Sequence, residues 1–520
     1  MKQRNIMFIV FLLISVFLFY KTEEGLTQSK PKLGGILNVG INTDVVQVDP
    51  HVNPSLNASI VMGHVFERLL YFGENMEFVP ILAEKWEIAP DLKTYTFFLR
   101  KGKIFHNGRE LVGDDVKYSI ERIMDPKTKN ARRSALESIE RIEVVDKYTV
   151  RFHLKKPDAD LLSTLGHTAT LMCVVPREEV EKQGGVMMHP VGTGPYKFVE
   201  WKPDRYVLLE RFPQYKQQPG PMNGFGGECI AYIDKIKFVP IPEDSVAEMA
   251  LLNKEIDFLL FVPHEKVEKF QKEYSKRGLV IDNASGLSWY GIFFGCDKAF
   301  TKDVKFRRAC AYAVDLKMVA EAATRGHATV NPSFVSSINQ FYSPFHKKWY
   351  KKDVKKAKQL LEESAYKGEI ISLITTKKYP LMYKNSVAVQ SELMGAGINV
   401  KLEVVEWATM LQRMYSGNFQ MISFGFGARP DPALAFREVA QAGFEEQYPR
   451  FKETRDKVAK TLDIETRKKL FEEAHSLVIE GVPALLLYNP NHFNAYWNYL
   501  KNFKVFPTNQ PRFWGAWIDK

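Results

Sequence analysis

The sequence predicts an α/β fold, and residues 369–426 predict it most clearly. Three apolar stretches there have the length of buried strands, and two stretches with helical spacing separate them. This β-α-β-α-β order favours a parallel sheet with right-handed crossovers. The length of 520 residues exceeds what one hydrophobic core normally supports, so two or three domains are expected. The strands are expected at 369–376, 398–405 and 419–426, and the helices at 380–397 and 407–417.

Short strands and helices also alternate along the N-terminal half of the chain. The predicted helix at 113–126 begins with aspartates and ends at a proline, as helix capping favours. A stretch rich in Gly, Pro and Gln, 213–227, predicts a loop. The other expected elements are strands at 36–42 and 94–100, a helix at 59–72, a β-hairpin at 139–154 and a strand pair at 192–201 and 205–212.

The N-terminus has the pattern of a secretory signal. Lys2 and Arg4 precede an apolar run at 6–20, which is shorter than the roughly 20 residues that a membrane span needs. We expect residues 1–28 to be a signal peptide and the mature, periplasmic protein to begin between Tyr20 and Lys32. No cysteine follows the run where a lipid anchor would need one. An uncleaved anchor is the alternative, because no clear small-x-small cleavage site is present.

The net charge of +11 could indicate nucleic acid as a partner. The lysines are spread over the chain, however, and the densest run, 346–358, predicts the solvated start of an amphipathic helix. An exported protein seldom meets nucleic acid, so no such partner is expected. The charge instead favours a position near an anionic membrane surface.

Motifs for catalysis or metal binding are lacking in the sequence. The chain has no H-E-x-x-H or G-x-S-x-G motif, and its histidines lack metal-ligand spacing. We therefore expect no enzyme, no cofactor and no metal site, with a secreted hydrolase as the alternative. No C-x-x-C pair occurs, and both disulfides and plain buried thiols remain open. The four cysteines are Cys173, Cys229, Cys296 and Cys310.

Aromatic residues are abundant, with 36 Phe, 22 Tyr and 8 Trp, and several lie near the ends of predicted strands. An aromatic lining with a few fixed charges is typical of a binding pocket, although each ring is equally suited to an ordinary core. Residues 424–432 follow this pattern, because an apolar strand ends there in Arg429 and Asp431. In open α/β sheets, ligands bind beyond the carboxyl ends of the strands. The sequence therefore predicts a ligand site at this edge.

Four segments in a fixed order resemble the family 5 extracellular solute-binding proteins. They are 80–126, 190–201, 232–258 and 300–319, and the resemblance extends from about Gly34 to the end of the chain. These proteins serve ABC importers for peptides, nickel complexes and related solutes. The resemblance implies a two-lobed, periplasmic-binding-protein-like fold of the large type II variant, with a ligand cleft between the lobes. It also implies an ABC permease as partner and a monomer that closes on its ligand.

The resemblance also implies domain boundaries. Lobe I would be discontinuous and would carry an inserted subdomain, and lobe II would contain the β-α-β-α-β segment. Crossing segments near 285–295 and 484–493 would form the hinge. The implied ranges are 32–62, 185–284 and 486–520 for lobe I, 63–184 for the inserted subdomain, and 285–485 for lobe II.

In peptide-binding members of the family, the segment matching 424–432 carries an aspartate that holds the ammonium group of the peptide. The corresponding position here is Ala428, and a cation, Arg429, follows it. A guanidinium favours a carboxylate or phosphate, so we expect a peptide-like or other small, anionic solute. A sensing or chaperone-like module and a nickel-type chelate binder are the alternatives. The expected ligand-binding residues are Arg429, Phe426, Trp407, Trp289, Tyr290, Asp431 and Thr193.

Overall fold

The computed structural model describes residues 30–52, 55–130, 133–167, 172–440, 443–508 and 510–520. Within it, Leu33–Lys520 form one compact unit. The predicted signal peptide, residues 1–28, lies outside the described residues. In the described ranges, no helix has the length and apolarity that crossing a membrane requires.

A twelve-stranded sheet runs through the described part of the chain, with the order β16-β15-β17-β13-β18-β11-β1-β10-β9-β8. Strands β12 and β14 also pair with β18. The strands are β1 (Ile36–Ile41), β8 (Tyr196–Lys202), β9 (Tyr206–Arg211), β10 (Lys235–Pro240), β11 (Phe258–Leu259), β12 (Leu279–Ser285), β13 (Trp289–Phe294), β14 (Ala328–Val330), β15 (Ile371–Thr375), β16 (Val400–Val404), β17 (Met421–Phe426) and β18 (Ala484–Trp497).

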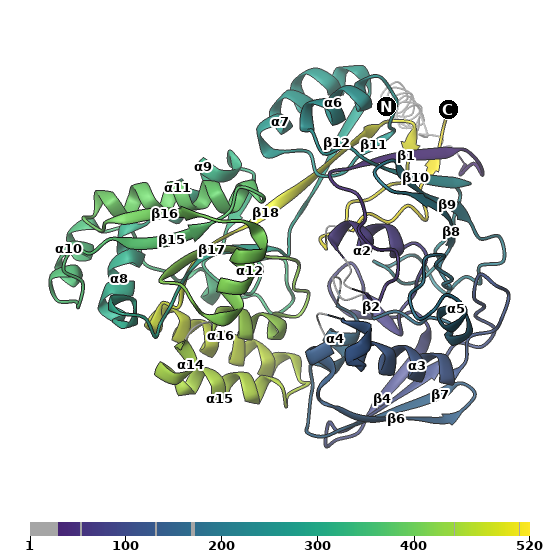
Figure 1. Ribbon diagram of the computed structural model, residues 1–520, viewed down its shortest axis with the longest axis horizontal. Helices are drawn as coiled ribbons and strands as arrows, with labels where there is room; N and C mark the ends of the chain where they lie inside the picture. Colours follow the sequence, from purple (N-terminus) through teal and green to yellow (C-terminus); the bar gives the residue numbers. More distant parts are fainter. Residues whose placement is uncertain (1–29, 53–54, 131–132, 168–171, 441–442, 509) are drawn as a thin grey trace, which may run out of the picture. The chain divides into compact units, whose positions relative to one another are not determined.

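The two halves of this sheet are β16-β15-β17-β13 and β11-β1-β10-β9-β8, and strand β18 connects them. It has 14 residues and is the long yellow strand near the centre of Figure 1. Its first half pairs with β13 and β14, and its second half pairs with β12 and β11. The chain passes directly from β12 to β13 through residues 286–288. Both segments that the resemblance implied as a hinge therefore run between the two halves.

The β-α-β-α-β prediction is confirmed by β15, β16 and β17. Strand β15 pairs in parallel with both β16 and β17, as two helical crossovers require. The crossover helices are α11 (Pro380–Gly395) and α12 (Trp407–Ser416). The other helices of this half are α8 (Val304–Ala313), α9 (Leu316–Thr324), α10 (Val354–Glu362), α13 (Phe436–Val439), α14 (Phe444–Gln447), α15 (Pro449–Val458) and α16 (Ile464–Gly481).

The N-terminal half holds a second, antiparallel sheet with the order β4-β5-β7-β6. The predicted hairpin at 139–154 is confirmed as β6 and β7. The elements here are β2 (Leu70–Phe72), β3 (Phe78–Pro80), β4 (Ala83–Ile88), β5 (Thr94–Leu99), β6 (Ile139–Asp146), β7 (Thr149–Leu154), α3 (Gly113–Met124), α4 (Leu161–Leu165) and α5 (Arg177–Lys182).

The helix predicted at 59–72 is confirmed only as far as Met62 and is wrong from Gly63 onward. Helix α2 (Leu56–Met62) ends at Gly63, and the chain then enters β2. The apolar run at 69–72 matched helical spacing, but these residues are buried on both sides and pair with β3. A short apolar run cannot be assigned to helix or strand by its period alone.

The three largest clusters of buried side chains in the described part of the chain are each named here by one of their strands. The β1 core draws on residues 37–66 and on β8–β11 with the C-terminus. The β5 core draws on 69–174, and the β17 core on 289–488. All four cysteines are buried, and burial raises the thiol pKa of Cys229 to about 12 and of Cys296 to about 11.

The remaining elements are short. Between β10 and β12 lie α6 (Asp244–Leu252) and α7 (His264–Lys269), which continues into a π-helical turn, η3 (Phe270–Tyr274). The C-terminus adds the pair β19 (Leu500–Lys501) and β20 (Trp517–Ile518). The 3-10 turns are η1 (Pro126–Thr128), η2 (Arg133–Leu136), η4 (Ser275–Arg277), η5 (Phe300–Lys302), η6 (Pro344–Lys347) and η7 (Pro432–Ala435).

Candidate functional site

Three of the residues predicted from sequence lie together at the carboxyl end of β17. Strands β13 and β17 pair with Trp289 opposite Phe426, and the two ring centroids lie 4.8 Å apart. Phe424 and Phe426 are two residues apart on one strand and therefore share a face. Their rings are 4.9 Å apart, and the ring of Phe424 stacks on Trp407 at 5.5 Å. Trp289, Phe426, Phe424 and Trp407 form what we call the aromatic row.

The two ends of the aromatic row differ in exposure. Trp289 is 2% exposed, and its indole Nε1 has no hydrogen-bond partner among the described residues. Trp407 opens α12 immediately after β16, is half-buried, and lies 4.6 Å from the ring of Tyr379. The row thus leads from the buried strand β13 to a partly exposed edge of the sheet.

Tyr290 points away from the aromatic row, because neighbouring residues of a strand face opposite sides of the sheet. Its ring stacks on Tyr488 at 5.7 Å, and the Tyr488 hydroxyl donates to Asn385 at 2.7 Å. A Cβ on Gly425 would lie only 2.3 Å from the Tyr290 ring, so this glycine makes room for it. Burial raises the pKa of Tyr290 to about 12.

Arg429 is buried and ion-paired with Glu438. The Arg429 Nε lies 3.1 Å from both Glu438 carboxylate oxygens, and the Nη2 also donates to this carboxylate. Its Nη1 donates to the carbonyls of Gly427 and Ala428 at 3.2 Å. The guanidinium carbon lies 5.9 Å from the centre of the Phe426 ring. Every nitrogen of Arg429 therefore has a protein acceptor.

Asp431 joins three elements. Its carboxylate caps η7 by accepting from the Ala433 backbone at 2.9 Å. Arg467 of α16 donates to both of its oxygens at 2.9 Å, and the Ser163 hydroxyl of α4 donates at 2.5 Å. Asp431 is 6% exposed. It is consequently shared by the β17 core, which holds α16, and the β5 core, which holds α4.

A second carboxylate reaches the same arginine. Arg467 lies 3.2 Å from Asp160, the residue before α4, and the Ala159 backbone donates to the Ala459 carbonyl at 2.7 Å. We call Asp160, Ser163, Asp431 and Arg467 the Arg467 bridge. Burial raises the pKa of Asp160, and the nearby Asp431 charge raises it further, against the opposing effect of Arg467. Sequence analysis missed this bridge, since no motif connects residues 307 positions apart.

Ala428 belongs to a small apolar cluster, and its carbonyl accepts from the Arg429 Nη1 at 3.2 Å. Its neighbours there are Met76, Leu287 and Phe506, with Phe225 packed against them. Ala428 is 6% exposed. The cluster combines residues from four distant parts of the sequence, and no sequence pattern marks it.

Thr193 lies apart from these residues, in a tight turn beside the β1 core. Its hydroxyl is buried and has no partner within the described residues. A Cβ on Gly192 would lie 2.1 Å from the Val65 carbonyl, and one on Gly194 would lie 2.4 Å from the His64 carbonyl. The two glycines therefore allow close backbone packing around Thr193.

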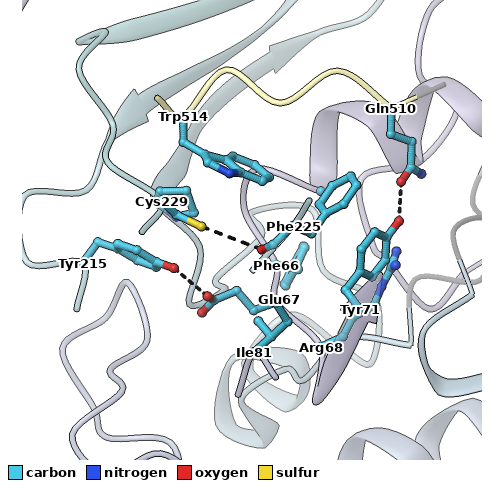
Figure 2. Close-up of a pocket in the computed structure, with 12 residues that line it drawn as sticks. Phe66, Glu67, Arg68, Tyr71, Ile81, Tyr215, Phe225, Cys229, Gln510 and Trp514 are labelled. Carbon is cyan, nitrogen blue, oxygen red and sulfur yellow. Dashed lines mark hydrogen bonds between the residues drawn. The ribbon is translucent and has the colours of Figure 1, made fainter. Parts of the chain in front are cut away.

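A separate pocket, lined mainly by apolar atoms, opens near the C-terminus (Figure 2). Its volume is about 40 Å³, and one water needs about 10–15 Å³, so it suits a few waters and not a peptide. Glu67 accepts from Tyr215 at 2.7 Å and from Lys103 at 3.2 Å, and Tyr71 donates to Gln510 at 2.5 Å. The lining residues are Gly63, Phe66, Glu67, Arg68, Tyr71, Ile81, Pro195, Tyr215, Phe225, Cys229, Gln510 and Trp514.

The chain matches the family model "Bacterial extracellular solute-binding proteins, family 5 Middle" over residues 77–448. The dipeptide-binding protein of Escherichia coli (strain K12) is 25% identical over 491 residues, which cover 88% of this chain and 89% of the relative. The glutathione-binding protein GsiB of Pectobacterium atrosepticum is 26% identical over 370 residues, 71% of this chain and 69% of the relative.

Solved structures agree with this match. The periplasmic binding protein DppA from Helicobacter pylori, in complex with the peptide STSA, superposes with a TM-score of 0.78 at 26% identity, covering 94% of this chain and 99% of that one. The binding protein AgaA from A. tumefaciens R10, in complex with agropinic acid, gives 0.76 at 26% identity, covering 92% and 96%. These similarities confirm the predicted α/β, periplasmic-binding-protein-like fold class.

Proposed function

We infer that this chain, which belongs to the bacterial extracellular solute-binding proteins of family 5, is the substrate-binding component of an ABC importer. It acts outside the cytoplasm, and its family binds solutes without transforming them. The fold suits this role, because a sheet with one long strand through both halves allows closure around a ligand.

The solute that we propose is peptide-like or another small, anionic molecule. Relatives bind related chemistry: one is named a dipeptide-binding protein, another a glutathione-binding protein, and AgaA holds agropinic acid. Peptides, glutathione and agropinic acid all carry a carboxylate. These molecules differ in their amine groups. This sequence departs from the peptide-binding pattern at Ala428, the position that would hold an amine.

The proposal rests on the side chains that surround Ala428. By resemblance, peptide-binding members of the family place an ammonium-holding aspartate at this position. Here Ala428 shares one apolar cluster with Met76, Leu287 and Phe506, and the charged group at its backbone is the Arg429 guanidinium. An ammonium group buried there would lose its water without gaining a carboxylate, which disfavours a free α-amine.

The proposed contact surface centres on the aromatic row, with Trp289, Phe426 and Trp407 as its wall. Aromatic faces bind the apolar parts of small solutes, and a few polar groups fix the orientation of the solute. Arg429 supplies a cation at the edge of this row, and it can bind a solute only when its ion pair with Glu438 breaks. Tyr290 and Asp431 remain proposed contacts on the strength of the sequence, whereas the close backbone packing around Thr193 favours a structural role for that residue.

We further propose that the protein is periplasmic, that it is a monomer, and that it delivers its solute to a membrane permease. The Arg467 bridge, which is formed in this structure, would be a contact that opening of the predicted lobes breaks, since Asp160 and Ser163 fall in the inserted subdomain and Asp431 and Arg467 in lobe II. Small-angle scattering of the mature protein tests lobe closure, because saturating solute is expected to lower the radius of gyration.

The solute class is tested with the peptide STSA and its N-acetylated form, after native mass spectrometry of the purified protein has identified any retained solute. Calorimetry is expected to show that acetylating the amine leaves the wild-type affinity unchanged. In the Ala428→Asp variant, the free amine is expected to bind better than the acetylated form. A wild type that binds only the free amine contradicts the proposal.

A further inference from the structure

The C-terminal segment between β19 and β20 buries a second arginine near Ala428. Arg512 is 3% exposed. Its Nε and Nη1 are fully buried, and neither has a hydrogen-bond partner among the described residues. The described residues also provide no ion pair to Arg512. A guanidinium has five N–H donors, and burying them without acceptors is costly.

Aromatic rings flank this guanidinium. Its carbon lies 4.7 Å from the centre of the Phe506 ring and 5.7 Å from that of Phe225. Ring faces attract a cation, by about 2 kcal/mol when it is desolvated, but they accept no strong hydrogen bonds. Burial lowers the pKa of Arg512 to about 10, and Glu74 and Cys229 oppose this effect from a distance. The cation is therefore held in place but not neutralised.

The position of Arg512 connects it to the proposed solute site. Its partner ring, Phe506, belongs to the apolar cluster that contains Ala428 and Leu287. The Leu287 backbone donates to the Pro507 carbonyl at 3.4 Å, and the Arg429 backbone donates to the Leu287 carbonyl at 3.4 Å. The C-terminal segment and the carboxyl end of β17 thus meet at Leu287.

A second unused donor lies on the same segment. The indole Nε1 of Trp514 is buried and without a partner in the described part of the chain. Its ring lies 5.7 Å from the ring of Phe225, which Arg512 also contacts. Figure 2 shows Trp514 extending from the C-terminal segment to the pocket, which Phe225 also lines. Two buried donors beside one aromatic ring suit an oxyanion.

We propose that Arg512 is the anion-recognising residue of the solute site, and that it binds a carboxylate of the imported solute. The inference rests on the proposed function and deepens it, because it transfers the anion contact from Arg429 to Arg512. The reason is charge compensation: Glu438 already neutralises Arg429, whereas no carboxylate of the described residues pairs with Arg512. A carboxylate that binds Nη2 together with either Nε or Nη1 would give one of these buried donors an acceptor in a bidentate fork.

The test is calorimetry and thermal unfolding of the mature protein with four probes: STSA, its C-terminal amide, glutathione and agropinic acid. At least one free acid is expected to bind the wild type, and the C-terminal amide is expected to bind more weakly than STSA. Arg512→Met is expected to weaken binding of that acid by at least about thirtyfold, as the loss of one partner of a desolvated pair does. The affinity of Arg512→Lys is expected to lie between those of the wild type and Arg512→Met, because lysine keeps the charge but cannot bind a carboxylate in a bidentate way.

Arg122→Met is the matched control, since Arg122 is buried and paired with Asp49 at 2.7 Å. Without solute, Arg122→Met is expected to lower the melting temperature, and Arg512→Met is expected to preserve or raise it. Arg512→Met with wild-type affinity, or with a loss of stability like that of Arg122→Met, overturns the inference. So does a wild type that retains a neutral or cationic solute, although the binding function then stands. A wild type that carries no solute and binds no probe contradicts the proposed function as well.

Discussion

Arg429 and Arg512 are both buried, at 6% and 3% exposure, and both lie beside a phenylalanine ring. Their other neighbours differ. Arg429 donates to the Glu438 carboxylate and to two carbonyls, while the buried donors of Arg512 reach no acceptor in the described residues. The difference teaches that burial alone does not make a cation available to a ligand. Availability depends on whether the protein already supplies the counter-charge.

Arg467 marks the opposite extreme to Arg512, because two carboxylates share its guanidinium. We expect Arg467→Met to have the largest effect on stability. Removing one partner of a buried ion pair costs about 3–5 kcal/mol, since it leaves the other charge buried without compensation. Here Asp160 and Asp431 would also repel each other. Urea unfolding measures the loss.

Lys468→Met on the same helix is the control for this variant. Lys468 pairs with Glu465 on the surface at 2.8 Å, and exposed pairs contribute about 0–1 kcal/mol. If both variants lose the same free energy of unfolding, then the Arg467 bridge contributes no more than a surface pair, and the ranking of the buried arginines is wrong.

The next largest effect concerns the pair that neutralises Arg429. Arg429→Met is expected to lower the free energy of unfolding by roughly 1–3 kcal/mol, because Glu438 loses a buried partner. Adding Glu438→Gln is expected to restore part of this loss, with a coupling energy of roughly 0.5–3 kcal/mol. A double-mutant cycle from urea unfolding measures the coupling. Additive effects would mean that Arg429 is not compensated by Glu438 and is free to bind solute.

Local sequence patterns predicted the strands and helices around these arginines, but they did not predict which side chains surround the guanidinium groups. The strands β15, β16 and β17 were predictable because apolar runs and helical spacing alternate within a few residues of each other. The same argument failed at 63–72, where a buried strand and a helix share one apolar pattern. Trp289 and Phe426 were predicted as ligand contacts separately, and the register of β13 and β17 explains why they meet.

Charge compensation was not predictable in this way. Glu438 is nine residues from Arg429, and only the turn η7 followed by α13 brings its carboxylate back to the guanidinium. Asp160 and Arg467 are 307 residues apart. Arg512 lies in an irregular segment without a motif, so sequence analysis gave it no role. Each case depends on tertiary contacts that a periodic pattern does not encode.

A smaller effect is expected from the pH dependence of the Arg467 bridge. Asp160 faces Arg467, Asp431 and Asp158, and its pKa is raised in the folded protein. Folded Asp160 therefore takes up a proton at a pH where an unfolded aspartate is still ionised, and its contribution to stability grows as the pH falls from 8 towards 5.5. We expect wild type to gain of the order of 1 kcal/mol over this range relative to Asp160→Asn.

Urea unfolding of both proteins at the two pH values measures this difference. The comparison cancels the contribution of the buried histidines, because burial lowers their pKa in the folded protein while the unfolded imidazoles titrate within this range. Asn at position 160 keeps an oxygen for Arg467 but does not titrate. Parallel pH profiles for the two proteins would show that Asp160 is ionised throughout, like an exposed aspartate.

The smallest expected effect tests whether every unsatisfied buried polar group marks a ligand contact. Thr193 resembles Arg512 in that its hydroxyl is buried without a partner in the described residues, but it carries no charge. Gly192 and Gly194 pack against the backbone at His64 and Val65, which leaves little room for a solute beside it. We expect Thr193→Val to change the free energy of unfolding by at most about 1 kcal/mol, with stabilisation favoured because a methyl group replaces an unsatisfied hydroxyl. Solute affinity in calorimetry is expected to stay at the wild-type value. Weaker binding by Thr193→Val with unchanged stability would instead place Thr193 at the solute, as the sequence proposed, and would extend the site from the charged donor to a neutral one.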